Sequence, residues 1–147
     1  MATKDMFSKN RVTFDLKAKT KNEAIDELIE ILYADGKVTS KEELKKAVLK
    51  REEEFSTGIG MGIAIPHGKC SAVKEPTITF GLSKAGIDYK SMDDKPAHLF
   101  FLIAVPEESS DVHLRALSEI SRKLMHEDVR EGLKKAQNFD EFIKVFE

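Results

Sequence analysis

The sequence predicts a single α/β domain in which a β-sheet is covered by helices on both faces. Apolar stretches with the character of strands are interleaved with stretches that have helical spacing. This interleaving is typical of a sheet with helices packed on both of its faces. The chain has 147 residues, which is the size of one ordinary domain. A domain of that size buries about 68–70% of its unfolded surface, enough for a core. We therefore expect one domain over residues 1–147.

The N-terminal third contributes one strand and two helices. Residues 1–10 carry only scattered apolar side chains, and we expect them to form a loose segment. In Arg11–Leu16 every second residue is apolar, which predicts a half-buried strand. Two helices follow, and each opens on a hydroxyl side chain with a glutamate three residues later, the signature of a capping box. The first helix begins at Thr20 and ends near Tyr33, and the second begins at Ser40 and runs towards Arg51.

The second half contributes two strands and three helices. Thr77–Leu82 and Ala97–Val105 are predicted strands, and Ala97–Val105 is apolar enough to lie in the middle of a sheet. Residues 86–95 between them are polar and rich in turn formers, which predicts a loop. The helices are expected to open at Ser110 or Asp111, near Asp128, and at Asn138.

The least ordinary local chemistry lies between Arg51 and Gly68, where the sequence reads REEEFSTGIGMGIAIPHG. Its four glycines let the backbone take positive φ and let another group approach bare N–H donors. Ile63–Ile65 predicts a short buried strand, and we expect Pro66 to end its hydrogen-bonding ladder. His67 is then placed at a strand end, where the chain turns and side chains face solvent.

Two interpretations of His67 are open at this point. A neutral imidazole is a good nucleophile near pH 7, and a loop of N–H groups with a nearby arginine suits the oxygens of a phosphoryl group. In this interpretation His67 handles phosphate and Arg51 is a charge clamp. In the other, Pro66–Gly68 is a turn whose imidazole is hydrogen-bonded and structural. The glycine spacing matches neither a Walker A loop nor a dinucleotide fingerprint, so it does not decide between them.

His113 is predicted to lie in the first turn of a helix. There the backbone N–H groups and the helix dipole favour an anion and disfavour an imidazolium. A neutral His113 could donate an N–H to a phosphoryl oxygen. Taken alone, a first-turn histidine is more often simply exposed, but beside His67 and the glycine loop it is better explained as a partner of His67.

The remaining histidines and the single cysteine are given structural interpretations. Cys70 lacks further ligands at a spacing typical of a metal site and is interpreted as a small, partly buried thiol. His98 lies within an apolar strand and is interpreted as hydrogen-bonded, and His126 as a surface residue. The alternative from a different class is a metal-dependent hydrolase using His67, His98 and His113, which would need a bound metal. We expect no metal and no cofactor.

The composition argues against several classes of partner. Lys plus Arg number 24 and Asp plus Glu number 26, so the net charge of −2 gives no electrostatic case for binding nucleic acid or an anionic membrane. No apolar run approaches the roughly 20 residues of a membrane span or has the form of a secretory signal. We expect a cytoplasmic protein without a nucleic-acid partner and without insertion into a membrane.

Two separated motifs resemble one known family. Arg51-Glu52, Ser56–Gly60 and Gly62–Gly68 are similar to the signature of the fructose/mannitol-type Enzyme IIA domain (EIIA type 2) of the bacterial phosphoenolpyruvate-dependent sugar phosphotransferase system, abbreviated PTS. His113-Leu114, about 45 residues further on, resembles the second active-site histidine of that family. The resemblance extends from about Arg11 to the C-terminus.

The resemblance implies an activity and a set of roles. It implies a mixed sheet and a phosphocarrier, in which His67 accepts a phosphoryl group on Nε2 as a tele-phosphohistidine. It gives His113 a hydrogen bond to that group and Arg51 a charge-stabilising role, without a cofactor. The implied donor is the phosphocarrier protein HPr, and the implied acceptor is a cysteine on the IIB domain of a membrane permease.

The resemblance leaves one functional alternative and one docking question open. The alternative is a nitrogen-related regulatory IIA protein, which acts by phosphorylation-dependent protein binding. The sequence from Ala97 to Leu114 looks more like the fructose type, which favours sugar transport. Ile59 and Met61 are expected to be partly exposed and to contact a partner; otherwise both pack beneath the glycine loop.

Overall fold

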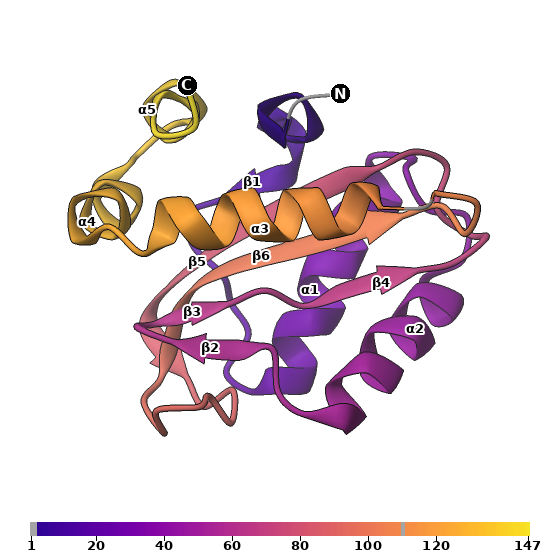
Figure 1. Ribbon diagram of the computed structural model, residues 1–147, viewed down its shortest axis with the longest axis horizontal. Coiled ribbons are helices and arrows are strands. Elements are labelled where there is room, and N and C mark those ends of the chain that lie inside the picture. Colours follow the sequence, from indigo (N-terminus) through magenta and orange to yellow (C-terminus); the bar gives the residue numbers. More distant parts are fainter. Residues whose placement is uncertain (1–2, 110) are drawn as a thin grey trace.

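The computed structural model describes residues 3–109 and 111–147, and it confirms an α/β fold built on a mixed sheet (Figure 1). The strand order is β1-β5-β6-β3-β2, with β4 also beside β6. The β5–β6 and β2–β3 pairs are antiparallel, and β1, β3 and β4 run parallel to their neighbours β5, β6 and β6. The strands are β1 (Val12–Thr13), β2 (Gly58–Gly60), β3 (Ile63–Ala64), β4 (His67–Lys69), β5 (Thr77–Ile87) and β6 (Ala97–Val105).

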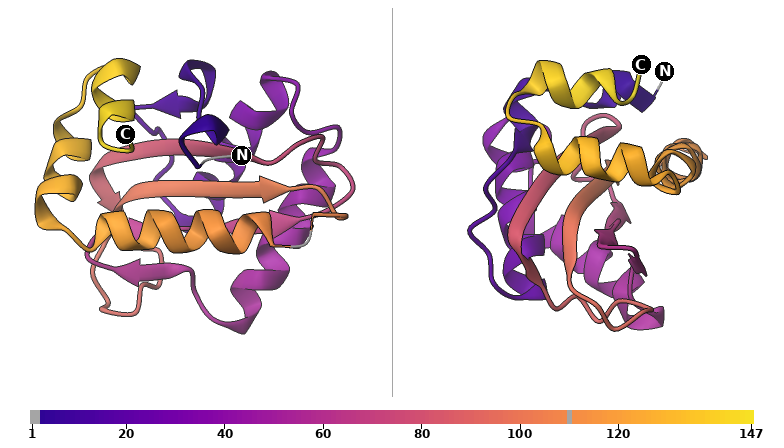
Figure 2. Two further views of the ribbon diagram at one scale, coloured as in Figure 1. Left: turned by 45° about the horizontal axis from the view of Figure 1, so that its top comes forward. Right: turned by 90° about the vertical axis from the view of Figure 1, so that its left-hand side faces the viewer.

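Helices cover both faces of this sheet (Figure 2). One face is covered by α1 (Lys21–Ala34) and α2 (Lys41–Glu54), and the other by α3 (Val112–Leu124) with the C-terminal helices and the N-terminal turn. The remaining helices are α4 (Glu127–Lys135), α5 (Phe139–Lys144) and the 3-10 helices η1 (Thr3–Met6) and η2 (Lys9–Arg11).

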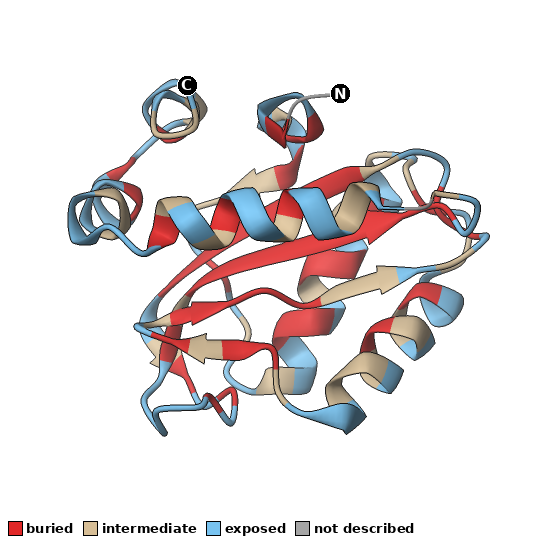
Figure 3. Cartoon of the chain, viewed as in Figure 1, coloured by how far each residue is buried: buried red, intermediate tan, exposed pale blue. Residues whose placement is uncertain are grey.

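Strand β6 is the central strand that its composition predicts. Phe100, Leu102 and Ala104 point into the core under α1 and α2, whereas Phe101 and Ile103 point into the core under α3. Because successive side chains of a strand face opposite sides of the sheet, a strand between two cores needs apolar residues at every position. The colouring by burial shows β6 as buried along its length, apart from the half-buried His98 (Figure 3).

Three helix caps form as predicted. The side-chain oxygens of Thr20, Ser40 and Asn138 accept hydrogen bonds from the backbone N–H three residues later, at 3.2, 3.2 and 2.9 Å. Each bond satisfies an N–H that has no partner within the helix. For α3, Asp111 occupies the N-cap position, and Ser110 lies outside the described residues.

Two predicted strand ranges are wrong in length. The strand expected over Arg11–Leu16 is only Val12–Thr13, because Arg11 closes a 3-10 helix and its guanidinium pairs with Asp35 at 2.7 Å. The strand expected to end at Leu82 continues to Ile87, which pairs with Ala97 of β6 across an irregularity in the register.

The expectation of a loose N-terminus is also wrong for the described residues 3–10. Met6 and Phe7 are 2% and 6% exposed. The Phe7 ring packs edge-on against Phe142 with ring centroids 5.1 Å apart, and against Phe146 at 4.9 Å. The first turn therefore joins α5 as part of the core on the α3 face of the sheet.

We predict that Phe7→Ala lowers the free energy of unfolding by about 3–5 kcal/mol, because it removes a buried ring and leaves a cavity. The measurement is urea denaturation followed by circular dichroism. Met125→Ala is the control, since Met125 is 63% exposed and surface changes usually stay within about 0.5 kcal/mol. Equal midpoints for the two variants would contradict the docking of the N-terminal segment.

Candidate active site

His67 lies within a strand that Pro66 interrupts without ending. Ile63 pairs with Leu99 of β6, and His67 pairs with Ile103, so β3 and β4 share one register on β6. Pro66 still accepts a hydrogen bond from Ile103 N at 3.0 Å, although it has no N–H to donate. The expectation that the chain turns at His67 is therefore wrong: the missing N–H removes one ladder bond, and the strand resumes directly afterwards.

The His67 ring is held by its own backbone. Its Nδ1 lies 3.0 Å from the carbonyl oxygen of Ile65. Since a carbonyl oxygen can only accept, Nδ1 carries the proton and the lone pair is on Nε2. Burial lowers the pKa of His67, and the Arg51 charge lowers it further, against a raising effect of the Ile65 hydrogen bond. Burial therefore favours the neutral ring, in which Nε2 carries the lone pair.

His113 lies beside this ring in the first turn of α3, as its sequence position predicts. The two imidazoles are stacked, with centroids 6.3 Å apart and planes inclined by 28°. Burial lowers the pKa of His113, and the charges of His67 and Lys69 lower it further. Within the described chain its Nδ1 is buried without a hydrogen-bond partner, which is uncommon for a purely structural side chain.

Arg51 occupies the last turn of α2, near enough to His67 for its charge to lower that pKa. The guanidinium lies 4.6 Å from the centre of the Phe55 ring, and its Nη1 donates to the carbonyl oxygen of Phe55 at 3.0 Å. Glu54 lies 3.9 Å away. The structure therefore brings Arg51, His67 and His113 from α2, β4 and α3 into one region.

Three N–H groups of the glycine loop are already used within the fold. The N–H groups of Thr57, Gly58 and Met61 already donate to Glu52, Ser56 and Asp93, each at 3.0 Å. These three donors serve the fold of the loop. The backbone donors nearest in the fold to His113 are instead the first N–H groups of α3, which have no acceptor within the helix.

The glycines of the loop have geometric roles instead. Gly60 and Gly62 take φ of 96° and 78° around Met61 and form the turn between β2 and β3. This turn lies at the end of β3 away from β4 (Figure 1). At Gly68, a Cβ would stand 3.0 Å from a methyl of Val48 in α2, so glycine permits the close contact of β4 with that helix.

The two predicted docking residues differ in exposure. Met61 is 39% exposed at the turn between β2 and β3, and Ile59 is half-buried in β2. Both belong to the β2–β3 hairpin, which precedes β4 in the chain and in which β2 forms the edge of the sheet beside β3 (Figure 1).

The other singled-out residues lie where their structural interpretations put them. Cys70 is a half-buried free thiol whose pKa is raised by burial. His98 is half-buried, with Nδ1 2.9 Å from the carbonyl oxygen of Ser83, and His126 is exposed. Over residues 3–109 and 111–147, no three His, Cys, Asp or Glu side chains are grouped as metal ligands. No helix in the same residues is both long and apolar enough to cross a membrane.

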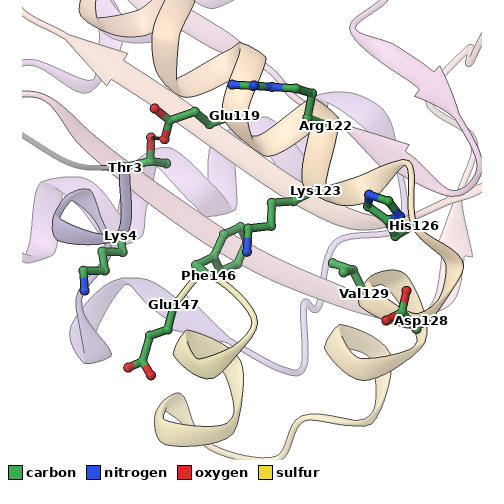
Figure 4. A pocket seen from close by; sticks show the side chains of 10 residues that line it. All are labelled: Thr3, Lys4, Glu119, Arg122, Lys123, His126, Asp128, Val129, Phe146 and Glu147. Atoms are coloured by element: carbon green, nitrogen blue, oxygen red, sulfur yellow. Dashed lines mark hydrogen bonds between the residues drawn. The ribbon is translucent and has the colours of Figure 1, made fainter.

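A cavity of about 800 Å³ lies at the C-terminal half of α3 (Figure 4), whereas His113 is in the first turn of this helix. Its lining joins the C-terminal half of α3 to η1, α4 and the C-terminus, with Lys4, Arg122 and Lys123 around Phe146. Arg51, His67 and His113 do not line it.

Comparison with known families identifies the family to which this chain belongs. The family model described as "Phosphoenolpyruvate-dependent sugar phosphotransferase system, EIIA 2" matches residues 5–147. The chain belongs to this family. It forms an EIIA type 2 domain.

Relatives of this EIIA chain include sugar-specific components and nitrogen regulatory proteins. The fructose-specific EIIA component of Haloferax volcanii is 48% identical over 119 residues, which are 81% of this chain and 77% of that protein. The fructose-specific EIIABC component of Bacillus subtilis is 42% identical over 145 residues, but this chain spans only 23% of its length. The nitrogen regulatory protein of Bradyrhizobium diazoefficiens is 31% identical over 140 residues, which are 94% of this chain and 90% of that protein.

Similar solved structures also include a nitrogen regulatory protein and a sugar-specific enzyme. The nitrogen regulatory protein IIA-Ntr of Neisseria meningitidis superimposes with a TM-score of 0.90 at 26% identity, over 98% of each chain. The mannitol IIA enzyme of Escherichia coli, solved in complex with its phosphorylated IIB enzyme, gives a TM-score of 0.79 at 27% identity, over 95% of each chain.

We predict that the imidazole of His67 in this EIIA chain is the neutral Nδ1–H tautomer and titrates below the ordinary histidine pKa of about 6.5. Long-range ¹⁵N–¹H NMR of the ring measures both properties. Because the folded pKa is lowered, the unfolded chain binds the proton first as the pH falls. This group therefore contributes stability above about pH 6.5 that is lost as the pH falls through the folded pKa. An Nε2–H ring, or a midpoint above 6.5, would contradict the geometry.

Proposed function

We propose that this chain is a phosphocarrier that accepts a phosphoryl group from phosphorylated HPr on His67 and passes it to a cysteine of a IIB domain. The observation that carries the proposal is the contact between His67 Nδ1 and the Ile65 carbonyl oxygen. It leaves Nε2 as the nucleophile of a ring whose pKa is lowered by burial. Family membership supports the same chemistry.

The first step is an in-line transfer between two imidazoles. The lone pair on His67 Nε2 attacks phosphorus, and the N–P bond of the donor phosphohistidine breaks with its electron pair returning to the donor nitrogen. His67 keeps its Nδ1 proton, donated to the Ile65 carbonyl oxygen, throughout. The transition state of such a transfer is loose and highly charged, so positioning and electrostatics provide most of the rate.

Three features surround the phosphoryl group with positive potential. Arg51 brings a full charge from the end of α2. His113 brings an N–H, and the first turn of α3 brings backbone N–H groups and the positive end of a helix dipole. These groups stabilise the phosphoryl oxygens as their charge develops.

The second step passes the group to a thiolate of a IIB domain. The solved complex of the mannitol IIA and phosphorylated IIB enzymes supports a partner of this kind. The sulfur attacks phosphorus, and the electron pair of the N–P bond returns to His67 Nε2. We place both steps in the cytoplasm, where phosphoenolpyruvate is made.

Sugar transport is favoured over regulation by sequence. The identities of 48% and 42% to fructose-specific components exceed the 31% to a nitrogen regulatory protein. A fructose-like substrate for the partner permease is therefore our first choice. The regulatory alternative rests on the superposition with IIA-Ntr at a TM-score of 0.90.

We predict that the chain, incubated with phosphoenolpyruvate, Enzyme I and HPr, gains one acid-labile phosphate by intact mass. His67→Ala abolishes the gain because it removes the nucleophile. His113→Ala and Arg51→Met slow it by roughly 100-fold each, the usual loss for removing one preorganised stabilising group. His126→Ala is the matched control, because its ring is exposed and lies outside this site.

An unphosphorylated wild type in the presence of active HPr would overturn the phosphocarrier assignment. Transfer from the phosphorylated chain to a IIB cysteine then separates the two uses of the carrier. Rapid transfer supports transport, whereas a stable phosphohistidine that changes binding to another protein supports regulation.

We predict that Met61→Ala raises the KM for HPr several-fold and leaves kcat unchanged, because Met61 offers an exposed apolar contact but no charge near the reaction. Steady-state phosphorylation at varied HPr concentration measures both constants. Met92→Ala is the comparison, since Met92 is 74% exposed and its N–H bonds to the carbonyl of Gly58 in the same hairpin. An unchanged KM for Met61→Ala would remove this hairpin from the docking surface.

A further inference from the structure

Glu52 is a buried carboxylate directly next to Arg51 in α2. Its side chain is 5% exposed, although its neighbours Glu53 and Glu54 are exposed. Lys21 lies 2.9 Å from one of its oxygens and neutralises the charge. A carboxylate is rarely buried to this degree unless it has a specific structural or functional use.

The partners of Glu52 converge from three separate elements. It accepts hydrogen bonds from the N–H of Thr57 at 3.0 Å and from the Thr57 hydroxyl. The hydroxyl of Tyr89 donates to it at 3.3 Å, and the Lys21 ammonium also lies 4.6 Å above the Tyr89 ring. Burial, followed by the nearby Glu52 charge, raises the pKa of Tyr89, so that hydroxyl keeps its proton and remains a donor.

Three hydrogen bonds, joined through the backbone of Thr57 and of Ile65, lead from this carboxylate to the His67 ring. Glu52 holds the N–H of Thr57. The carbonyl of Thr57 accepts the N–H of Ile65 at 3.0 Å. The carbonyl of Ile65 accepts Nδ1–H of His67 at 3.0 Å. Every link therefore has ordinary hydrogen-bond length.

The path fixes position rather than relaying charge. The N–H and the carbonyl of Thr57 belong to different peptide units, and the same is true of Ile65, so no single conjugated group connects Glu52 to the ring. Each hydrogen bond instead fixes the position of one segment relative to the one before it. Thr57 is placed against α2, Ile65 against Thr57, and His67 against Ile65.

We propose that Glu52 is a positioning residue for His67, holding the Ile65 carbonyl where it selects the Nδ1–H tautomer and aims Nε2 at the donor; this inference rests on the proposed phosphocarrier function. The last turn of α2 then sets two parts of the site at once. Arg51 faces the phosphoryl group, and the next residue anchors the loop behind the nucleophile.

The test compares Glu52→Ala, Thr57→Val and Glu53→Ala in the full chain. Glu53→Ala is the matched control, because it removes the same charge from the same helical turn at an exposed position. Thr57→Val deletes only the hydroxyl contact and keeps the N–H. Ring ¹⁵N NMR of His67 reports the tautomer, and HPr-dependent phosphorylation reports the rate.

We expect Glu52→Ala to mix the two neutral tautomers of His67 and to lower kcat/KM about 10- to 100-fold, the usual cost of a misplaced reacting group. We expect Thr57→Val to change the tautomer ratio and kcat/KM in the same direction but to a smaller extent. This variant tests the positioning role if Glu52→Ala does not fold. Glu53→Ala matches the wild type in both measurements.

The two readouts keep this inference distinct from the proposed function. A His67 ring that remains purely Nδ1–H in Glu52→Ala or Thr57→Val overturns the positioning role, whatever the rate. A wild type that HPr does not phosphorylate overturns the proposed function, while the NMR comparison still decides whether Glu52 positions the ring.

Discussion

The hydrogen bond from His67 Nδ1 to the Ile65 carbonyl oxygen is the interaction on which the chemistry of the site depends. It forms because of where this segment lies in the sheet. Successive carbonyls of a strand point to opposite sides. Pro66 turns its carbonyl towards β6 and accepts from Ile103, so the Ile65 carbonyl points away from β6. On that side β4 has no neighbouring strand among the described elements, and the oxygen is available to the imidazole.

Burial and neighbouring charges favour the neutral form of both imidazoles. The environment lowers the pKa of His67 and of His113, and in each case burial is the first cause. Two protonated rings with centroids 6.3 Å apart would also repel each other. In the proposed transfer, a neutral His67 has a lone pair to attack phosphorus, and a neutral His113 retains one N–H to donate. In the proposed mechanism, the negative charge of the phosphoryl group then favours a cationic ring beside it.

The sequence predicts those parts of the fold that depend on local patterns, and misses those that depend on distant partners. Residues within the same short segment determine the caps at Thr20 and Ser40 and the burial of β6. The docking of Phe7 requires rings from α5 and the C-terminus, more than 130 residues away. A short polar segment with one phenylalanine therefore looks loose until its partners are known.

The site shows the same division. His67, His113 and Arg51 could be picked out by residue type and position, and the fold brings them together. Which N–H groups are available could not be predicted, because the acceptors of the glycine loop include Asp93 on a remote loop. Glu52 could not be distinguished from Glu53 and Glu54 in the run of three. The Glu52 side chain is buried because it points towards Lys21, Thr57 and Tyr89, which surround its carboxylate.

In the proposed mechanism, the position of Arg51 suits a phosphoryl group that is received from one partner and given to another. Its guanidinium is held by the Phe55 carbonyl and ring, with Glu54 nearby, and so it is not committed to His67 alone. A clamp locked onto the phosphohistidine would stabilise the intermediate as much as the transition states on either side of it, and such uniform binding does not speed transfer. An arginine shared with Phe55 contributes its charge while the group moves and still has other partners when it has left.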